Sequence, residues 1–194
     1  MLSSIHPLGE RARHNRWALT AAAFTFGAAV SGSLVGMALG TLGSVAAPLQ
    51  GSSLLLTTAA GALVAGGLDM TGVKPPGPRR QVNETWIGAY RGWVYGAGFG
   101  LQLGLGVATY VVTWGVIATY LAALATVSPT QGALVGATFG VGRSLSLWLA
   151  GYVDRPSRLT GFNRRLASAG PAIRKASAVA LVVLGLGLIA GGVL

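Results

Sequence analysis

The sequence predicts an all-helical (all-α) protein that crosses a membrane several times. Of its 194 residues, 52% are apolar and only 9% are charged, which is too little polar surface for a soluble domain of this length. Almost all of the charged residues fall in residues 1–16, 69–91 and 154–175. The stretches between them are apolar and rich in glycine, as membrane-spanning helices are.

Five apolar windows are long enough to cross a hydrocarbon core about 30 Å thick, which takes about 20 residues of helix. They form one integral membrane domain over residues 1–194, with spans at about 17–39, 53–70, 92–125, 131–153 and 176–194. The third window is long for one straight helix, so we expect a broken or strongly tilted one. The first window could be read as a signal peptide, but it runs well past the apolar length typical of one, which favours a retained helix.

The basic residues predict the orientation of the spans, because short cytoplasmic loops accumulate Lys and Arg. Two spans separate each basic segment (1–16, 71–91 and 154–175) from the next, so all three can face the cytoplasm together. The short uncharged connections at 43–51 and 126–130 then lie outside, with the C-terminus. We expect a multi-pass protein of a prokaryotic cytoplasmic (cell) membrane with its N-terminus in the cytoplasm.

The lipid bilayer is the partner that the charge pattern predicts. A net charge of +10 would also suit nucleic acid, but the basic residues flank spans and are not interleaved with aromatic residues, so we expect no nucleic-acid binding. Residues 159–169 fit two interpretations. They form a basic interfacial helix with Leu159, Phe162 and Leu166 on its apolar face, or they form a solvated loop.

Glycines recur four residues apart within four of the spans. Such stripes are smooth and let helix backbones approach closely in lipid. Glycine-rich helix packing is the favoured interpretation, and sliding of helices during a transport cycle is the alternative. The residues are Gly32, Gly36 and Gly40; Gly96, Gly100 and Gly104; Gly132, Gly136 and Gly140; and Gly187 and Gly191.

Arg143 lies near the middle of the fourth span. A cation at that depth costs at least about 2.5 to 3.5 kcal/mol, so its side chain should face a cavity or a partner. The best acidic candidate is Asp69, nearer the cytoplasmic end of the second span, which Arg143 would have to snorkel to reach. An anion or solute site and a structural role for Arg143 both stay open.

Polar residues also recur on one helical face of the third span, at Gln102, Thr109 and Thr113. Such a stripe could line a water-filled path for a solute. Threonine in a membrane helix also commonly bonds to its own preceding turn, so a purely local role is the alternative.

The sequence predicts no enzyme. The chain has no cysteine, which excludes thiol–disulfide oxidoreductase chemistry, and its two histidines, His6 and His14, lie in the basic leader. The four acidic residues are scattered, so no paired-carboxylate, triad or metal site can be assembled within the spans, and we expect no cofactor and no metal.

From Gly96 onward the chain resembles the membrane domain of the cytochrome c biogenesis protein CcdA and the disulfide reductase DsbD, in the LysE/DsbD superfamily. Three stretches carry the resemblance. They are Gly98-Phe99-Gly100 with Gly104 and Gly106; Gly132-Ala133-Leu134-Val135 with Phe139, Gly142 and Gly151; and Ile173-Arg174-Lys175 before the last span.

The resemblance implies two repeats of three helices, each with a reactive cysteine beside prolines in a broken helix. Aligned on the glycines, Tyr110 takes the cysteine position and Thr109 and Thr113 take proline positions. Arg143 stands where an apolar residue is usual. If the first two spans match the family's second and third, the family's first helix is missing, in agreement with a cytoplasmic N-terminus.

These observations predict a CcdA-like protein that transports or exports a small solute, with an anion as one candidate, along a path that involves Arg143, Gln102, Thr109 and Thr113. The alternative is a non-catalytic accessory or assembly subunit of a membrane complex. The missing helix favours that alternative, since an incomplete repeat needs a second copy or another membrane protein to close its bundle.

Overall fold

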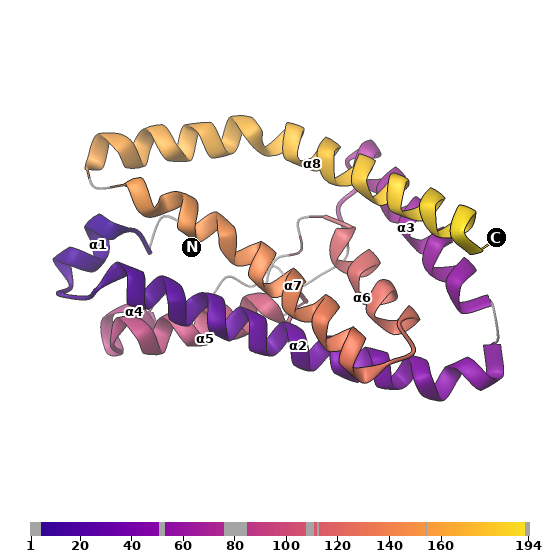
Figure 1. The fold of residues 1–194 in the computed structure, drawn as a ribbon. Helices are drawn as coiled ribbons and strands as arrows, with labels where there is room; N and C mark the ends of the chain where they lie inside the picture. The colour runs from indigo at the N-terminus through magenta and orange to yellow at the C-terminus, as the bar shows by residue number, and fades with distance from the viewer. Residues whose placement is uncertain are drawn as a thin grey trace. The chain divides into compact units, whose positions relative to one another are not determined.

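The computed structural model describes residues 5–50, 53–75, 85–107, 111, 113–153 and 155–192, and within them all regular secondary structure is helical (Figure 1), which confirms the all-α prediction. The elements are α1 (Pro7–Ala12), α2 (Trp17–Gln50), α3 (Ser53–Thr71), α4 (Thr85–Ala89), α5 (Gly92–Gly104), α6 (Gly115–Ala125), α7 (Pro129–Trp148), the 3-10 turn η1 (Leu149–Tyr152) and α8 (Pro156–Gly192).

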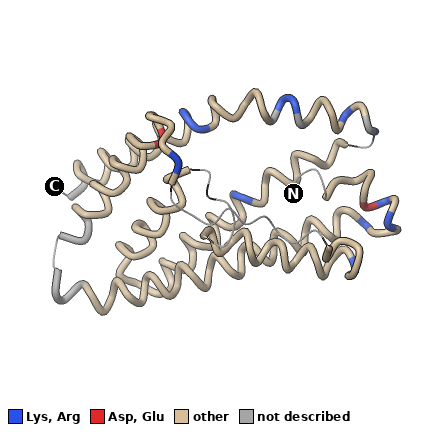
Figure 2. The backbone as a smooth tube through the Cα atoms, turned by 180° about the vertical axis from the view of Figure 1, so that it is seen from behind, with Lys and Arg blue, Asp and Glu red and all other residues tan. Residues whose placement is uncertain are grey.

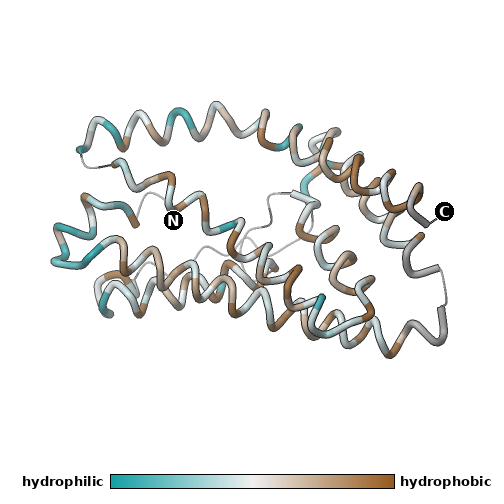
Figure 3. The backbone as a smooth tube through the Cα atoms, in the orientation of Figure 1, coloured by the Kyte–Doolittle hydropathy of each residue, from teal (hydrophilic) through white to brown (hydrophobic). Residues whose placement is uncertain are grey.

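Three helices in the described part of the chain are long and apolar enough to cross a membrane. They run over Trp17–Ala46, Pro129–Tyr152 and Ser157–Ala190. Figure 2 shows that α2 and α6 carry no charged residue, and Figure 3 shows that α8 changes from a polar first half to an apolar second half. This pattern is consistent with a membrane protein.

Two segments outside the predicted spans are helical. The predicted outer connection at 43–51 continues α2 as far as Gln50. The predicted cytoplasmic segment 154–175 is helical from Pro156 onward, so the helix interpretation of 159–169 is right and the loop interpretation is wrong. Leu159 and Phe162 explain this second difference, because they pack against Ala150 and Val153 and so bury the apolar face of a helix.

The third predicted span is interrupted. Helix α5 ends at Gly104 and α6 begins at Gly115. Gly106 has a φ of 72°, the left-handed conformation that glycine adopts readily just after a helix, so the sequence itself stops α5 here. Window 92–125 therefore holds two helices, of 13 and 11 residues.

The helices divide into two compact units. One consists of Met1–Gly32, Arg79–Tyr110 and Ala137–Ala169, and the other of Ser33–Pro78, Val111–Gly136 and Gly170–Leu194. Helices α2, α7 and α8 contribute residues to both units.

In the first unit, the N-terminal segment is part of the core. Ile5 joins a cluster of side chains, each at most 4% exposed, with Phe24 of α2, Tyr95 and Phe99 of α5, and Leu147 of α7. The basic leader therefore does not simply lie in solvent. Its apolar Ile5 holds it against three helices.

Glycines bring α5 and α7 directly onto α2 within the first unit. A Cβ added at Gly100 would overlap the carbonyl oxygen of Phe24, and one added at Gly104 or Gly140 would overlap that of Ala28. Only a glycine allows helix backbones to approach this closely.

The second unit uses the same kind of contact. A Cβ added at Gly36 would overlap the carbonyl oxygen of Gly132, and one added at Gly61 would overlap the side chain of Leu121. Helix α3 packs against α6 and also against α8, where a Cβ added at Gly66 would lie 2.9 Å from the carbonyl oxygen of Ala178.

Candidate functional site

Arg143 of α7 binds the open end of α5. Its Nη1 donates to the carbonyl oxygens of Leu103 at 3.0 Å and Gly106 at 3.4 Å. Its guanidinium carbon also lies 5.4 Å from the centre of the Phe139 ring. The last carbonyls of a helix have no partner inside the helix and carry partial negative charge. A guanidinium at this end supplies both hydrogen-bond donors and the opposite charge.

Asp69 of α3 binds the open start of α6. Its Oδ1 accepts a hydrogen bond of 2.9 Å from the backbone N–H of Trp114, the residue that precedes α6. The indole Nε1 of Trp114 donates to the carbonyl oxygen of Val73 at 2.8 Å. A carboxylate is the expected partner at this end, because the first amides of a helix need acceptors and carry partial positive charge.

The carboxylate of Asp69 is only half satisfied. The residue is 3% exposed, and its Oδ2 is buried with no hydrogen-bond partner in the described structure. Leaving a buried polar atom unpaired is costly, and most so for a charged group.

The remaining predicted site residues are only partly placed. Gln102 lies half-buried on α5, and Thr113 lies half-buried just before α6. Thr109 and Tyr110 lie outside the described residues. Arg143 and Asp69 belong to different compact units. Arg143 contacts the end of α5 in the first unit, and Asp69 contacts the start of α6 in the second.

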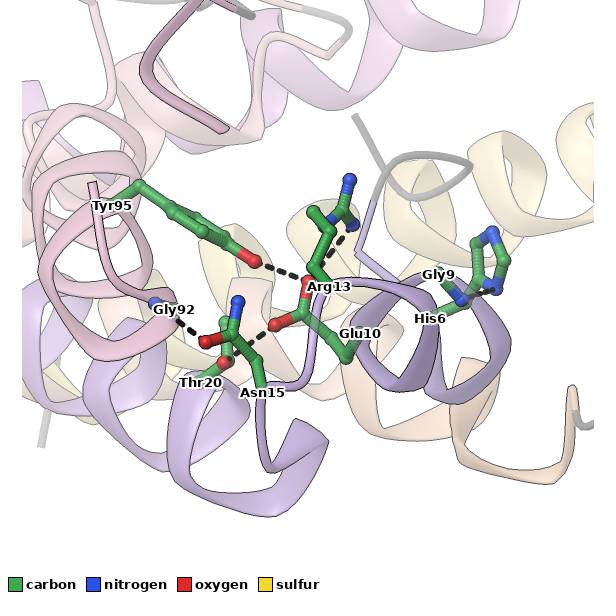
Figure 4. A network of polar contacts seen from close by, with 8 residues as sticks. All are labelled: His6, Gly9, Glu10, Arg13, Asn15, Thr20, Gly92 and Tyr95. Carbon is green, nitrogen blue, oxygen red and sulfur yellow. Dashed lines mark hydrogen bonds and ion pairs between the residues drawn. The ribbon is translucent and has the colours of Figure 1, made fainter. Parts of the chain in front are cut away.

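A second polar cluster, the Glu10 network, was missed by sequence reasoning (Figure 4). Glu10 is fully buried, and its carboxylate accepts hydrogen bonds from Tyr95, from Thr20 at 2.9 Å and from Arg13 at 2.9 Å, the last also an ion pair. Next to it, Asn15 Oδ1 accepts a hydrogen bond of 3.4 Å from the backbone N–H of Gly92.

The Glu10 network joins three elements, since Glu10 lies on α1, Thr20 on α2 and Tyr95 on α5. Glycine makes room for it, because a Cβ at position 92 would lie 3.0 Å from Glu10 Oε2. Each carboxylate oxygen has at least one donor, so the network suits a structural junction better than a ligand site. The only sequence signal was an acidic residue among basic ones, and nothing in the sequence pairs positions 10 and 95.

His6 caps the start of α1. Its Nδ1 accepts a hydrogen bond of 3.1 Å from the backbone N–H of Gly9, so this nitrogen carries no proton. Burial and the positive charge of Arg13 lower the pKa of His6 below its ordinary value, against a smaller opposing effect of Glu10.

Metal binding has no support in the described residues, where no three His, Cys, Asp or Glu side chains come together. The resemblance to CcdA and DsbD stays a prediction, because no family model, curated protein or solved structure matches this chain.

Proposed function

We propose that this chain is a multi-pass protein of a prokaryotic cytoplasmic membrane that moves a small solute, with anions as the candidate class, along a path that involves Arg143. The proposal rests mainly on one observation. Arg143 reaches from α7 to the carbonyl oxygens at the end of α5, where a positive charge suits the end of the helix, and it lies in a partly buried position.

Broken helices of this kind have a clear physical logic in membranes. Non-helical backbone at membrane depth is tolerated only where it is buried in protein or lines a water-filled cavity. In many transporters the half-helix ends at such breaks form the site for solute and ion. Gln102, half-buried on α5 in the same compact unit as Arg143, would supply a neutral polar contact along the path.

Helix lengths support five crossings with the N-terminus inside. Helices α5 and α6 have 13 and 11 residues, each shorter than the roughly 20 that one crossing needs, so we count window 92–125 as a single crossing. Helix α3, with 19 residues, supplies another crossing beside the three long apolar helices. Helix α8 has 37 residues and reaches about 55 Å, so its basic first half projects beyond the hydrocarbon.

We further propose that glycine stripes set the packing of these spans, in a CcdA-like bundle without the cysteines. The overlaps that added Cβ atoms would cause at Gly100, Gly104 and Gly132 support this packing. In lipid, close backbone approach replaces the hydrophobic driving force that packs helices in water.

Osmotic swelling of proteoliposomes, followed by light scattering, tests the transport proposal. The external potassium salt is changed among chloride, nitrate, phosphate and acetate, with valinomycin present so that K⁺ enters together with the anion, and empty liposomes treated in the same way are the baseline. Swelling should exceed this baseline for at least one anion. Rates equal to empty liposomes for all four salts would contradict the transport of small anions.

Variants of Arg143 separate its charge from its hydrogen bonds. Arg143→Lys keeps the positive charge and should keep part of the anion flux. Arg143→Gln keeps an N–H donor for the α5 carbonyls but loses the charge, so its anion flux should fall to the rate of empty liposomes. Leu145→Ala on the same helix, where the side chain is 57% exposed, is the matched control and should transport normally. Full flux in Arg143→Gln would remove Arg143 from the path.

The second candidate is a non-catalytic accessory or assembly subunit. The contacts of Arg143 with two carbonyl oxygens and the Phe139 ring favour it, because they are what a structural role requires. A photocrosslinker attached to a cysteine at Leu134, which is 69% exposed, should then give one defined adduct in native membranes. The absence of a specific adduct there would count against this candidate.

A further inference from the structure

Three helix ends meet at one end of the first unit. The start of α2 meets the end of α7, where the rings of Trp17 and Trp148 lie 5.5 Å apart. The segment just before α2 also meets the start of α5, through the hydrogen bond of 3.4 Å from the Gly92 N–H to Asn15 (Figure 4). Residues that are far apart in the sequence therefore come together at this end of the unit.

An arginine stands at each of these helix ends. Arg16 precedes α2, Arg91 precedes α5, and Arg155 comes shortly after η1, the turn that continues α7. All three are exposed, and no described residue accepts a hydrogen bond or an ion pair from their guanidinium groups. Glu10, the acidic residue described in this unit, is fully buried and pairs with Arg13, so it does not neutralise them.

Exposed aromatic rings lie at the same helix ends. Trp93 lies in the first turn of α5, Trp148 is the last residue of α7, and Tyr152 is the last residue of η1. Tryptophan and tyrosine concentrate at the level of the lipid headgroups, because one part of each ring is apolar and the other is polar. We define the arginine–aromatic surface as Arg16, Arg91, Arg155, Trp93, Trp148 and Tyr152.

Apolar side chains continue from this surface along the same helices. Leu19 on α2, Leu101 on α5 and Leu145 on α7 are all exposed. Such side chains are covered more favourably by a fatty acyl chain than by water. A ligand with an anionic head and an apolar tail therefore fits this part of the molecule better than a free inorganic anion.

We propose that the arginine–aromatic surface binds the headgroup phosphate of anionic phospholipids at the cytoplasmic side of the membrane. A guanidinium holds a phosphate through paired, charge-assisted hydrogen bonds, and basic pockets between membrane helices bind anionic headgroups. A zwitterionic headgroup offers the same phosphate but adds a cation, which the arginines repel. The inference rests on the proposed membrane location and not on the proposed transport.

Quenching of tryptophan fluorescence by brominated lipids tests the proposal, because two tryptophans belong to the surface. The full chain is reconstituted into mixed bilayers of phosphatidylglycerol and phosphatidylcholine, in which one lipid or the other carries the bromine. From the dependence on lipid composition, phosphatidylglycerol should bind at least severalfold more tightly than phosphatidylcholine. Equal binding of the two lipids to the unmodified protein would overturn the proposal.

Two variants with the same loss of charge separate this surface from the overall positive charge. The surface variant should bind the two lipids nearly equally, and it combines Arg16→Gln, Arg91→Gln and Arg155→Gln. The control variant changes exposed positions on α8 and should keep the preference, and it combines Arg164→Gln, Arg165→Gln and Lys175→Gln. An equal loss of preference in both variants, or no loss in the surface variant, would overturn the proposal.

Single substitutions keep the test decisive if the surface variant does not fold, as judged by circular dichroism. Arg91→Gln alone should lower the preference for phosphatidylglycerol more than Arg164→Gln alone, and equal effects would contradict the proposed site. The anion-flux assay distinguishes this inference from the proposed function. Lipid preference without anion flux would contradict transport alone, whereas flux without lipid preference would contradict this surface alone.

Discussion

At the scale of single residues, the charged and polar side chains in apolar surroundings organise the molecule. Glu10, Asp69 and Arg143 each contact a backbone or side-chain group from another helix. Each contact gives a polar group in apolar surroundings a hydrogen-bond partner, which lowers the cost of placing it there.

The Glu10 network makes a direct prediction at this scale. Tyr95→Phe removes one donor from a fully buried carboxylate, and a hydrogen bond to a charged group contributes about 1.5 to 3 kcal/mol. We expect that loss in the free energy of unfolding, measured in mixed micelles of increasing SDS content. Tyr90→Phe is the control, since Tyr90 is 54% exposed, and it should change stability by less than about 0.5 kcal/mol. Equal effects of the two variants would contradict the importance of the network.

His6 predicts how stability depends on pH. Because its pKa is lowered in the folded protein, the unfolded state binds more protons in the interval between the lowered value and the ordinary one of about 6.5. The stabilising effect is therefore fully present above about pH 6.5 and is lost as pH falls through the folded pKa. Thermal unfolding followed by circular dichroism should show a drop over this range.

A His6→Asn variant isolates this effect. Asparagine still accepts a hydrogen bond at the start of α1, but it does not titrate. The part of the pH dependence due to His6 should disappear in it. An unchanged curve would assign the dependence to other groups.

At the scale of helices, the glycines decide which faces can meet. Gly132 and Gly142 lie on the same helix, α7, but in opposite surroundings. A Cβ at position 132 would overlap the carbonyl oxygen of Gly36, whereas one at position 142 would meet no atom within 4 Å.

This contrast predicts opposite effects of the same substitution. Gly132→Ala should destabilise the protein by about 1 to 3 kcal/mol, because two backbones must move apart. Gly142→Ala should be neutral or stabilising by up to about 1 kcal/mol, since alanine favours helix. Unfolding of the two variants in the same mixed micelles makes the comparison. Similar losses in both would mean that close glycine contacts do not control packing here.

At the scale of the whole molecule, the absence of cysteine makes topology directly measurable. Two exposed positions suit single cysteines. They are Thr130, near the start of α7, and Ser168, in the basic half of α8. In intact cells an impermeant maleimide should label Thr130→Cys and leave Ser168→Cys unlabelled until the cells are opened, because basic segments stay in the cytoplasm. Labelling of both in intact cells would contradict the proposed orientation.

The prediction of the fold from sequence succeeded where the pattern is regular and failed at the ends of elements. The start of α2 at Trp17 and the extent of α3 agree with the predicted windows, since apolar runs define them. The loop predicted at 43–51 was wrong because small apolar residues there continue the helix. For residues 159–169 the sequence left a helix and a loop open, and they are helical because Leu159 and Phe162 find an apolar surface that no local pattern reveals.

By itself the sequence determined the helical class and the candidate spans, because hydrophobic length is a local property. It left open whether the third window is broken or tilted, and the structure places the interruption after Gly104. Only the tertiary structure decided which polar groups meet. Arg143 binds the end of α5, Asp69 binds the start of α6, and Glu10 meets Tyr95 across 85 positions of sequence. Such pairings depend on which helix faces lie together, and helix packing sets them through contacts far apart in the chain.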